Sequence, residues 1–262
     1  MNYLEQYYNA YNEEGRLLSR HGQVEYLTTM KYIDESLAGI DEPSILEIGA
    51  GTGRYSVTLA KRGLRVTAVE LVAHNLDVLR AKLDGTEPIT VLQGNALDLS
   101  VLPENAFDVT LVLGPMYHLY KRAEQLRALA EAVRVTKPGG RILVAYCMNE
   151  PTVIQYVFGL NHLREVMELN MLTPDWHCVS EPKDVFQLMR TEDIAALDAE
   201  LPVERLRLVA TDGATNYKRE LIDAMDGETF AKWLDFHFTI CERQDLIGAS
   251  HHTLDILRKP CE

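Results

Sequence analysis

Apolar runs and amphipathic stretches alternate along the middle of the chain. Five apolar runs have the length of buried strands, and they lie at residues 44–48, 65–69, 89–93, 107–113 and 141–146. Three intervening stretches carry apolar residues at helical spacing, and they lie at residues 54–62, 73–84 and 122–134. Strands that alternate with helices predict an α/β, doubly wound fold with a mostly parallel sheet covered on both faces.

Helical patterns precede this alternation. In residues 1–39, aromatic and apolar positions recur at intervals of three and four residues. The aromatic stripe consists of Tyr3, Leu4, Tyr7, Tyr8 and Tyr11. We expect residues 1–39 to form an N-terminal helical lid segment that docks onto a core of residues 40–146.

The stretch after the fifth predicted strand is too long for a simple crossover. Residues 147–202 contain an apolar helical pattern at 151–171, a short strand near 185–189 and a helix that we expect Thr191 to cap. They predict an inserted cap.

Residues 203–262 are expected to complete the core sheet. The predicted elements are a strand at 203–211, helices at 217–225 and 228–242, and a last strand at 251–259.

The first predicted strand ends in three glycines at alternate positions. Residues 45–53 read ILEIGAGTG, and the helix that follows ends at Gly63. Glycines allow positive φ and a close ligand, and the first N–H groups of the helix can bind a polar or anionic group. Glu70 closes the second strand, 19 residues beyond Gly51, where a carboxylate can bind both hydroxyls of a ribose. Together they predict a site for an adenosine cofactor.

The glycine spacing also bears on which nucleotide binds. A dinucleotide site requires G-x-G-x-x-G, in which the third glycine lets the helix pack beneath a pyrophosphate. This chain has G-x-G-x-G, followed by Arg54 and Tyr55. The spacing favours an adenosine cofactor without a pyrophosphate over a nicotinamide dinucleotide.

With these motifs the chain resembles the class I, Rossmann-like S-adenosylmethionine (SAM) dependent methyltransferases of the small-molecule type. Residues 47–53 match the family's first motif, and Val69 and Glu70 match its acidic second motif. Residues 107–113 resemble the family's fourth strand, and residues 132–141 resemble its helix, Lys-Pro-Gly-Gly turn and fifth strand. The resemblance implies SAM as the cofactor and a seven-stranded sheet whose last strand lies antiparallel between the fifth and the sixth.

The resemblance also implies which residues contact the cofactor. They are Glu47, Gly49, Ala50, Gly51, Thr52, Gly53, Tyr55, Glu70, Leu71, Asn75, Asn95, Ala96, Leu97, Leu113 and Gly114. Many members have Gly-Asp-Ala after the third strand, whereas this chain has Asn95 in place of the aspartate. Asn95 can still accept a hydrogen bond from the adenine amino group, but it brings no charge. Glu47 either contacts the amino-acid end of the cofactor or only braces the glycine turn.

The loop after the fourth strand, residues 113–120, is where we expect the methyl group of the cofactor. SAM is already activated, so the protein binds, aligns and excludes water, and it needs a base only for a hydroxyl or a protonated amine. We assign His118 as the candidate base and Tyr117 as the residue that orients the acceptor. The alternative is that His118 is a structural residue or a cofactor contact.

The same loop narrows the range of acceptor classes that we expect. Methyltransferases that act on exocyclic or amide nitrogens commonly show Asp, Asn or Ser before Pro-Pro-Tyr. This chain has Gly114 in the first position and Met116 in place of the second proline. The resemblance therefore disfavours nucleic-acid bases and protein glutamine as acceptors.

In many of the resembling enzymes, N-terminal helices and the inserted cap wall the acceptor pocket. The candidate acceptor-binding residues are Tyr7, Tyr8, Tyr11, Arg16, Arg20, Tyr117, Trp176 and His177. A sulfonium attracts aromatic faces, which supports the tyrosines. The alternative is that the tyrosines only bury area and that Trp176 anchors the cap to the core.

Composition, charge and cysteine spacing argue against several other classes of protein. The net charge of −13 and the pI near 5.1 give a field that repels phosphate backbones and anionic membranes. The four cysteines form no C-x-x-C pair, and His251 and His252 have no acidic or cysteine partner at metal spacing, so we expect no metal site. The first residues do not resemble a signal peptide, and no run has the length of a membrane span. We expect a soluble cytoplasmic protein, with monomer and homodimer both open.

The sequence therefore predicts a SAM-dependent methyltransferase that acts on an O, N or C atom of a small-molecule acceptor. Two alternatives stay open, a nicotinamide-dependent oxidoreductase and a SAM-binding regulatory protein without catalysis.

Overall fold

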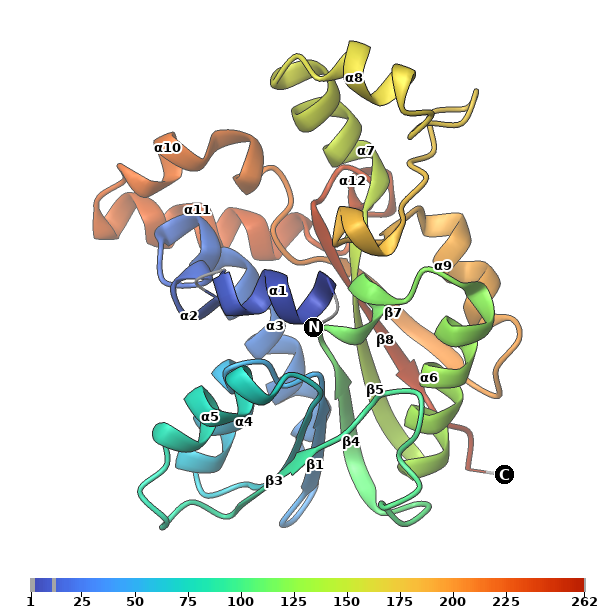
Figure 1. Cartoon of the computed structure of the whole chain (residues 1–262). Coiled ribbons are helices and arrows are strands. Elements are labelled where there is room, and N and C mark those ends of the chain that lie inside the picture. Colours follow the sequence, from blue (N-terminus) through green and yellow to red (C-terminus); the bar gives the residue numbers. More distant parts are fainter. Residues whose placement is uncertain (1–2, 11–12, 262) are drawn as a thin grey trace.

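The computed structural model describes residues 3–10 and 13–261, in which the strands form one eight-stranded sheet. The order along the sheet is β3-β2-β1-β4-β5-β8-β7, and β6 pairs with β5 beside this path. The strands are β1 (Ser44–Ile48), β2 (Arg65–Glu70), β3 (Ile89–Gln93), β4 (Phe107–Val112), β5 (Thr136–Met148), β6 (Leu188–Met189), β7 (Glu204–Ala210) and β8 (His252–Arg258). Figure 1 shows the sheet in the centre with helices on both sides, which confirms the predicted fold class.

The last strand, β8, lies antiparallel between β5 and β7, as predicted. The other strand pairs are parallel. The sheet has one strand more than predicted, because the two-residue strand β6 of the cap pairs with Cys147 and Met148 at the carboxyl end of β5. This pairing brings the cap to the edge of the sheet where β1 and β4 also end.

Alternating residues of the strands build a core on each face of the sheet. On one face, Ile45 of β1 belongs to the same buried cluster as Tyr32 of α3 (Arg20–Leu37) and Leu59 of α4 (Arg54–Lys61). On the other face, Leu46 shares a cluster with Leu129 of α6 (Arg122–Val135) and with residues of α9 (Thr191–Asp198). The period of two residues along β1 thus accounts for the helices on both sides.

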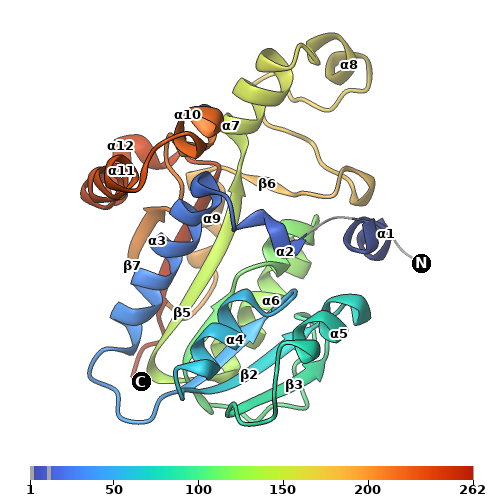
Figure 2. The ribbon, with the colours of Figure 1, turned by 90° about the vertical axis from the view of Figure 1, so that its left-hand side faces the viewer.

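The remaining helices lie at the carboxyl end of the sheet and beyond β7. The helix α1 (Tyr3–Ala10) contacts α5 (Ala73–Ala81) and the 3₁₀ helix η3 (Pro182–Asp184), and Figure 2 shows it between α5 and the loop of the cap. The others are α2 (Glu13–Arg16), η1 (Pro115–His118), η4 (Thr215–Lys218), α10 (Arg219–Asp223), α11 (Gly227–Ile240) and α12 (Gln244–Ile247). Within the described ranges, no helix has both the length and the apolar character needed to cross a bilayer.

The cap differs from its prediction in two places. The helix predicted at 151–171 is broken into α7 (Asn149–Thr152), a π-helical turn η2 (Val153–Gly159) and α8 (Leu163–Glu168). The break falls near Asn161, whose φ of 62° lies outside the helical region. Thr191 does not cap α9 but is its first residue; Arg190 precedes the helix, and its N–H donates to Asp193 Oδ2 at 2.7 Å.

Candidate active site

A cavity of about 240 Å³ lies at the carboxyl ends of the parallel strands. Its walls come from the glycine turn after β1, the end of β2, the turn after β3 and the loop after β4, with α1, α2, the cap and β8 closing it. All predicted cofactor residues line this cavity except Gly53. Because parallel strands end at one edge of the sheet, motifs far apart in the sequence meet here.

The three glycines of the turn have different reasons to be glycine. All three have positive φ, 74° at Gly49, 55° at Gly51 and 83° at Gly53. A Cβ on Gly49 would lie 2.6 Å from Cδ of Pro115, and a Cβ on Gly53 would lie 2.6 Å from Cγ of Leu79. A Cβ on Gly51 would meet no atom within 4 Å, and Gly51 lines the cavity. Gly51 therefore leaves room for a ligand, whereas Gly53 allows close packing of α4 against α5.

Glu70 is fixed beside this turn. Its carboxylate accepts hydrogen bonds from the N–H of Gly51 at 2.7 Å and from the N–H of Val72 at 2.8 Å. Burial raises the pKa of Glu70, while these N–H groups and the Asn75 side chain oppose the rise. These bonds hold the carboxylate in the wall of the cavity, where a ligand hydroxyl can approach it. This donor set fits the ribose of an adenosyl ligand.

Glu47 both lines the cavity and braces the turn. It is 1% exposed, and its Oε2 accepts from the N–H of Ser56 in the first turn of α4 at 2.8 Å. Burial raises the pKa of Glu47 to about 8, although the bonds from Ser56 oppose the rise. A carboxyl group with this pKa is mostly protonated at neutral pH and can donate a hydrogen bond to a ligand.

The turn after β3 contributes the position where the sequence departs from the family pattern. Asn95 Oδ1 accepts from the N–H of Leu97 at 2.9 Å, which fixes the side chain in an Asx turn at the rim of the cavity. Asn95 therefore lies where the resemblance placed it.

The loop after β4 carries Tyr117 and His118 into the cavity wall. His118 Nδ1 lies 2.7 Å from the carbonyl oxygen of Val185, to which Tyr120 also donates at 2.6 Å. Nδ1 must carry a proton to donate, which leaves the lone pair on Nε2. Burial lowers the pKa of His118 to about 4, so the ring is neutral at pH 7. Burial raises the pKa of Tyr117 well above its usual value, so this phenol is also neutral.

The N-terminal segment and the cap meet over the cavity. Tyr7 of α1 and Arg16 of α2 line it, as does Phe186 of the cap, and the rings of Tyr7 and Phe186 pack edge to face with centroids 5.7 Å apart. Arg20 is not a lining residue, and its guanidinium lies over the ring of Phe230, 6.0 Å from the centroid. Tyr11 lies outside the described residues, and of Tyr8 only the backbone in α1 is described.

The structure does not bring Trp176 or His177 to the cavity. Trp176 is 43% exposed and packs against Phe158, with ring centroids 5.5 Å apart. His177 Nε2 lies 3.3 Å from Asp193 Oδ2. Both residues therefore make their contacts within the cap and not in the cavity.

The sequence patterns did not predict that His252, Cys147 and Phe186 line the cavity. His252 has no acidic partner at metal spacing in the sequence, but the fold brings two carboxylates to it. His252 Nδ1 lies 2.7 Å from Asp212 Oδ2 and 3.4 Å from Glu25 Oε2. These partners come from α3 and from the end of β7, so no local spacing could reveal them. The only local signal was a histidine at the start of the strand predicted beside the fifth.

The fold is that of the SAM-dependent methyltransferases. A solved SAM-dependent methyltransferase from Methanosarcina mazei aligns with a TM-score of 0.58 at 15% identity, over 88% of this chain and 98% of that one. Residues 46–144 match the family model described as "Methyltransferase domain". This stretch of the chain is therefore a methyltransferase domain, which confirms the resemblance that the motifs predicted.

Proteins with similar sequences carry methyltransferase names, and each of them matches this chain over part of its length. An uncharacterized methyltransferase of Mycobacterium tuberculosis (strain ATCC 25618 / H37Rv) is 39% identical over 98 residues, which span 37% of this chain and 37% of the relative. A ubiquinone biosynthesis O-methyltransferase of Methylocella silvestris is 27% identical over 183 residues, 70% of this chain and 68% of that protein. The chain thus matches little more than a third of the length of the mycobacterial relative.

Proposed function

We propose that this protein is a SAM-dependent methyltransferase that methylates an O, N or C atom of a small molecule in the cytoplasm. The observation that carries the proposal is the cavity itself, which runs from the Gly51–Glu70 turn past Tyr117 and His118 to Arg16 and His252. One end has the donors and the space for an adenosyl ligand, and the other has polar and aromatic side chains for an acceptor. The name of the Methylocella relative, an O-methyltransferase, supports a small-molecule acceptor.

In this proposal the chain's own residues bind and align. Glu70 accepts from the ribose hydroxyls, Asn95 accepts from the adenine amino group, and the Glu47 carboxyl faces the amino-acid end. The cofactor, when bound, supplies an electrophilic methyl group on a sulfonium. Residues 1–39 and the cap, 147–202, exclude water from a site built on residues 40–146 and 203–262.

The two alternatives are less well supported. A nicotinamide cofactor needs the third glycine of G-x-G-x-x-G for its pyrophosphate, and this chain has Arg54 at that position. A purely regulatory SAM-binding protein needs no second, polar compartment beyond the cofactor, whereas Arg16 and His252 line this cavity.

Calorimetric titration with SAM, S-adenosylhomocysteine and NAD tests the proposal. We expect micromolar binding of the two adenosyl compounds and none of NAD. Gly51→Val should weaken binding by at least about tenfold, because its side chain enters ligand space at a positive φ. Glu70→Ala should weaken it by roughly 10- to 100-fold, because two hydrogen bonds to a carboxylate are lost.

Gly39→Val is the matched control for Gly51→Val. Gly39 also has a positive φ, 79°, a Cβ there would meet no atom within 4 Å, and the residue does not line the cavity. It carries the same backbone strain without the ligand contact, so its affinity for S-adenosylhomocysteine should match the parent. Binding of NAD alone, or parental affinity in Gly51→Val and Glu70→Ala, would refute the assigned cofactor site.

A further inference from the structure

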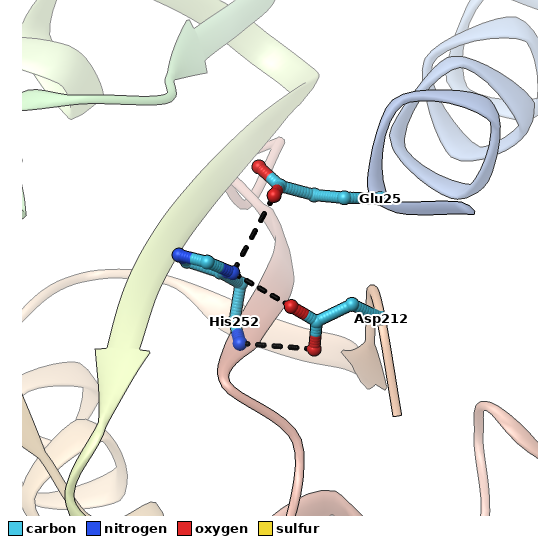
Figure 3. A group of neighbouring side chains, drawn as sticks. All are labelled: Glu25, Asp212 and His252. Carbon is cyan, nitrogen blue, oxygen red and sulfur yellow. Dashed lines mark hydrogen bonds and ion pairs between the residues drawn. The ribbon is translucent and has the colours of Figure 1, made fainter. Parts of the chain in front are cut away.

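Four charged side chains form a buried group beside the cavity, and they are Arg16, Glu25, Asp212 and His252. Figure 3 shows Glu25 of α3 and Asp212, which follows β7, with an oxygen each near one nitrogen of His252. That nitrogen, Nδ1, lies 2.7 Å from Asp212 Oδ2 and 3.4 Å from Glu25 Oε2. Glu25 also accepts from two nitrogens of the Arg16 guanidinium, at 2.7 and 3.0 Å. The group thus combines two acidic and two basic side chains.

Only the basic side chains of this group reach the cavity. Arg16 and His252 line it, whereas Glu25 and Asp212 do not. Glu25 is 7% exposed and Asp212 is 0% exposed. The carboxylates therefore lie behind the bases, and the positive side of the group faces the cavity.

The surroundings of His252 keep its ring protonated. The charged and titratable groups that face it are Glu25, Asp212, Cys147, Tyr117 and His251, with Arg16 behind Glu25. Burial lowers the pKa of His252, but Glu25, Cys147 and Asp212 raise it, and the result is a pKa well above the usual value. The ring is therefore an imidazolium at neutral pH, and both of its nitrogens are donors.

Asp212 fixes the orientation of this ring. Its carboxylate accepts from His252 Nδ1 at 2.7 Å, from the Ser250 hydroxyl at 2.6 Å and from the N–H of His251 at 3.0 Å. Figure 3 shows the other nitrogen, Nε2, pointing away from both carboxylates, and no residue that the structure describes bonds to it. Since His252 lines the cavity, the Nε2–H group is the donor that it offers to a ligand there.

A metal ion is a poor occupant for this group, although one ligand atom from each of Glu25, Asp212 and His252 lies within 4.8 Å of the others. Both oxygens of Glu25 accept from the guanidinium of Arg16, whose charge would repel a cation. The imidazolium has no lone pair for a metal. The side of the group that faces the cavity suits an anion instead.

A carboxylate at this position could belong to the acceptor or to the amino-acid end of the cofactor. The cofactor end has a cation of its own, because Arg54 also lines the cavity and directly follows the glycine turn. His252 lies among aromatic side chains, with its ring 6.1 Å from that of Tyr117, which is in turn 6.4 Å from the ring of Phe186. These surroundings favour an acceptor whose carboxylate is attached to an aromatic or apolar body.

We propose that His252 is a specificity-determining residue that binds a carboxylate of the methyl acceptor, and that the acceptors are small carboxylic acids with an aromatic or apolar body. The inference rests on the proposed function and goes beyond it in naming the acceptor class. The Nε2–H group of His252 donates to a carboxylate oxygen, and the charge of Arg16 adds to the attraction. Glu25 and Asp212 are positioning residues that keep the ring charged and in place.

Calorimetric titration with benzoate and benzamide tests the proposal on protein saturated with S-adenosylhomocysteine. The two probes share a ring and differ in charge. We expect benzoate to bind at least about tenfold more tightly, because a charge-assisted hydrogen bond in a buried site is stronger than a neutral one. The net charge of −13 repels anions, so the average field of the protein opposes this preference. His252→Gln should remove the preference.

His251→Gln is the matched control. His251 Nε2 pairs with Gln155 Oε1 at 2.8 Å, and His251 is not a lining residue. The N–H that donates to Asp212 belongs to the backbone, so the substitution keeps it. This variant should keep the parent's preference for benzoate.

A second titration separates the two possible sources of the carboxylate. 5′-Methylthioadenosine lacks the amino-acid end of the cofactor, whereas S-adenosylhomocysteine retains it. We expect His252→Gln to bind both compounds as the parent does. If His252→Gln binds S-adenosylhomocysteine more weakly but 5′-methylthioadenosine equally well, His252 holds the cofactor's own carboxylate and the inference is wrong.

The outcomes also separate this inference from the proposed function. If the parent does not bind S-adenosylhomocysteine, the proposed function fails. If it binds that compound but benzoate binds no more tightly than benzamide, or if His252→Gln keeps the preference, the inference about the acceptor is wrong while the proposed function stands. The comparison of the two probes on the parent decides this even if His252→Gln does not fold.

Discussion

At the scale of single residues, burial sets the charge of the histidine that the sequence singled out. His118 donates through Nδ1 to Val185, and burial lowers its pKa from 6.5 to about 4. The unfolded chain therefore takes up this proton as the pH falls through 6.5, whereas the folded protein does not until about pH 4. The stability that the neutral ring contributes is present above pH 6.5 and is lost as the pH falls toward 4.

The low pKa of His118 predicts how the stability of His118→Gln, relative to the parent, depends on pH. The variant should be less stable than the parent at pH 7 by about 1–3 kcal/mol, and this difference should shrink as the pH falls to about 4. Urea unfolding of both proteins across this range measures it. The buried histidines His237 and His251 are present in both proteins, so their titration cancels in the difference. A difference that is constant with pH would contradict the neutral state of His118.

Candidate residues that lie close together in the sequence also lie close together in the structure. The glycines and Glu70 lie within two short stretches, and their spacing alone brings them together once β1 and β2 pair. His252 could not be assigned in this way, because Glu25 and Asp212 reach it only after α3, β7 and β8 have packed. Trp176 was assigned by residue type alone, and the cap holds it away from the cavity.

At the scale of elements, a buried ion group joins β7 and β8, the pair that positions His252. Arg205 of β7 donates to Asp255 of β8 at 2.9 and 3.0 Å and lies 2.6 Å from Asp198. Asp255 is 0% exposed, and burial raises its pKa to about 8. The guanidinium thus lies between the Asp198 carboxylate and the Asp255 carboxyl group, which is mostly protonated at neutral pH.

Arg205→Met should therefore destabilise the protein by roughly 3–5 kcal/mol, because it leaves the Asp198 carboxylate, beside the buried Asp255, without its cation. The loss should become smaller as the pH falls, since protonation neutralises this carboxylate as well. Urea unfolding at several pH values measures both effects. The control is Arg258→Met on β8, which removes an exposed pair with Glu204 and should cost less than about 1 kcal/mol. Equal losses in the two variants would show that the buried group does not hold the strands together.

Element types were predictable and their boundaries were not. The alternation of apolar and amphipathic stretches predicted the strands of the sheet. Two of them differ in length from the prediction, since β6 is shorter and β5 is longer. β5 begins at Thr136 because Phe107 pairs with Thr136 across the turn that contains Gly139, before the regular register resumes at Arg141. Such pairings depend on a partner strand, and apolar periodicity does not report them.

At the scale of the whole molecule, the site is completed by parts of the chain that are not in the methyltransferase domain of residues 46–144. The helix α1 and the cap meet at the cavity, where the rings of Tyr7 and Phe186 pack edge to face. The cap is in turn fixed to the core, because Val185 accepts from His118 and Tyr120 and the N–H of Gln187 donates to the carbonyl of Tyr117. In the proposed function, residues 46–144 supply most of the cofactor contacts, and these segments decide how far the cavity is closed.

Because the contact between Tyr7 and Phe186 closes the cavity, the two side chains should act together on ligand affinity. Tyr7→Ala and Phe186→Ala should each weaken S-adenosylhomocysteine binding about 3- to 10-fold, since either one opens the cavity. The double variant should lose less binding free energy than the sum of the two single losses, by about 0.5–1.5 kcal/mol. Either single truncation already removes the contact between the two rings, so the second truncation cannot remove it again. Calorimetry on the four proteins measures this coupling. Tyr3→Ala, on the same helix but 58% exposed and not a lining residue, should bind like the parent. Strictly additive losses would mean that α1 and the cap cover the cavity independently.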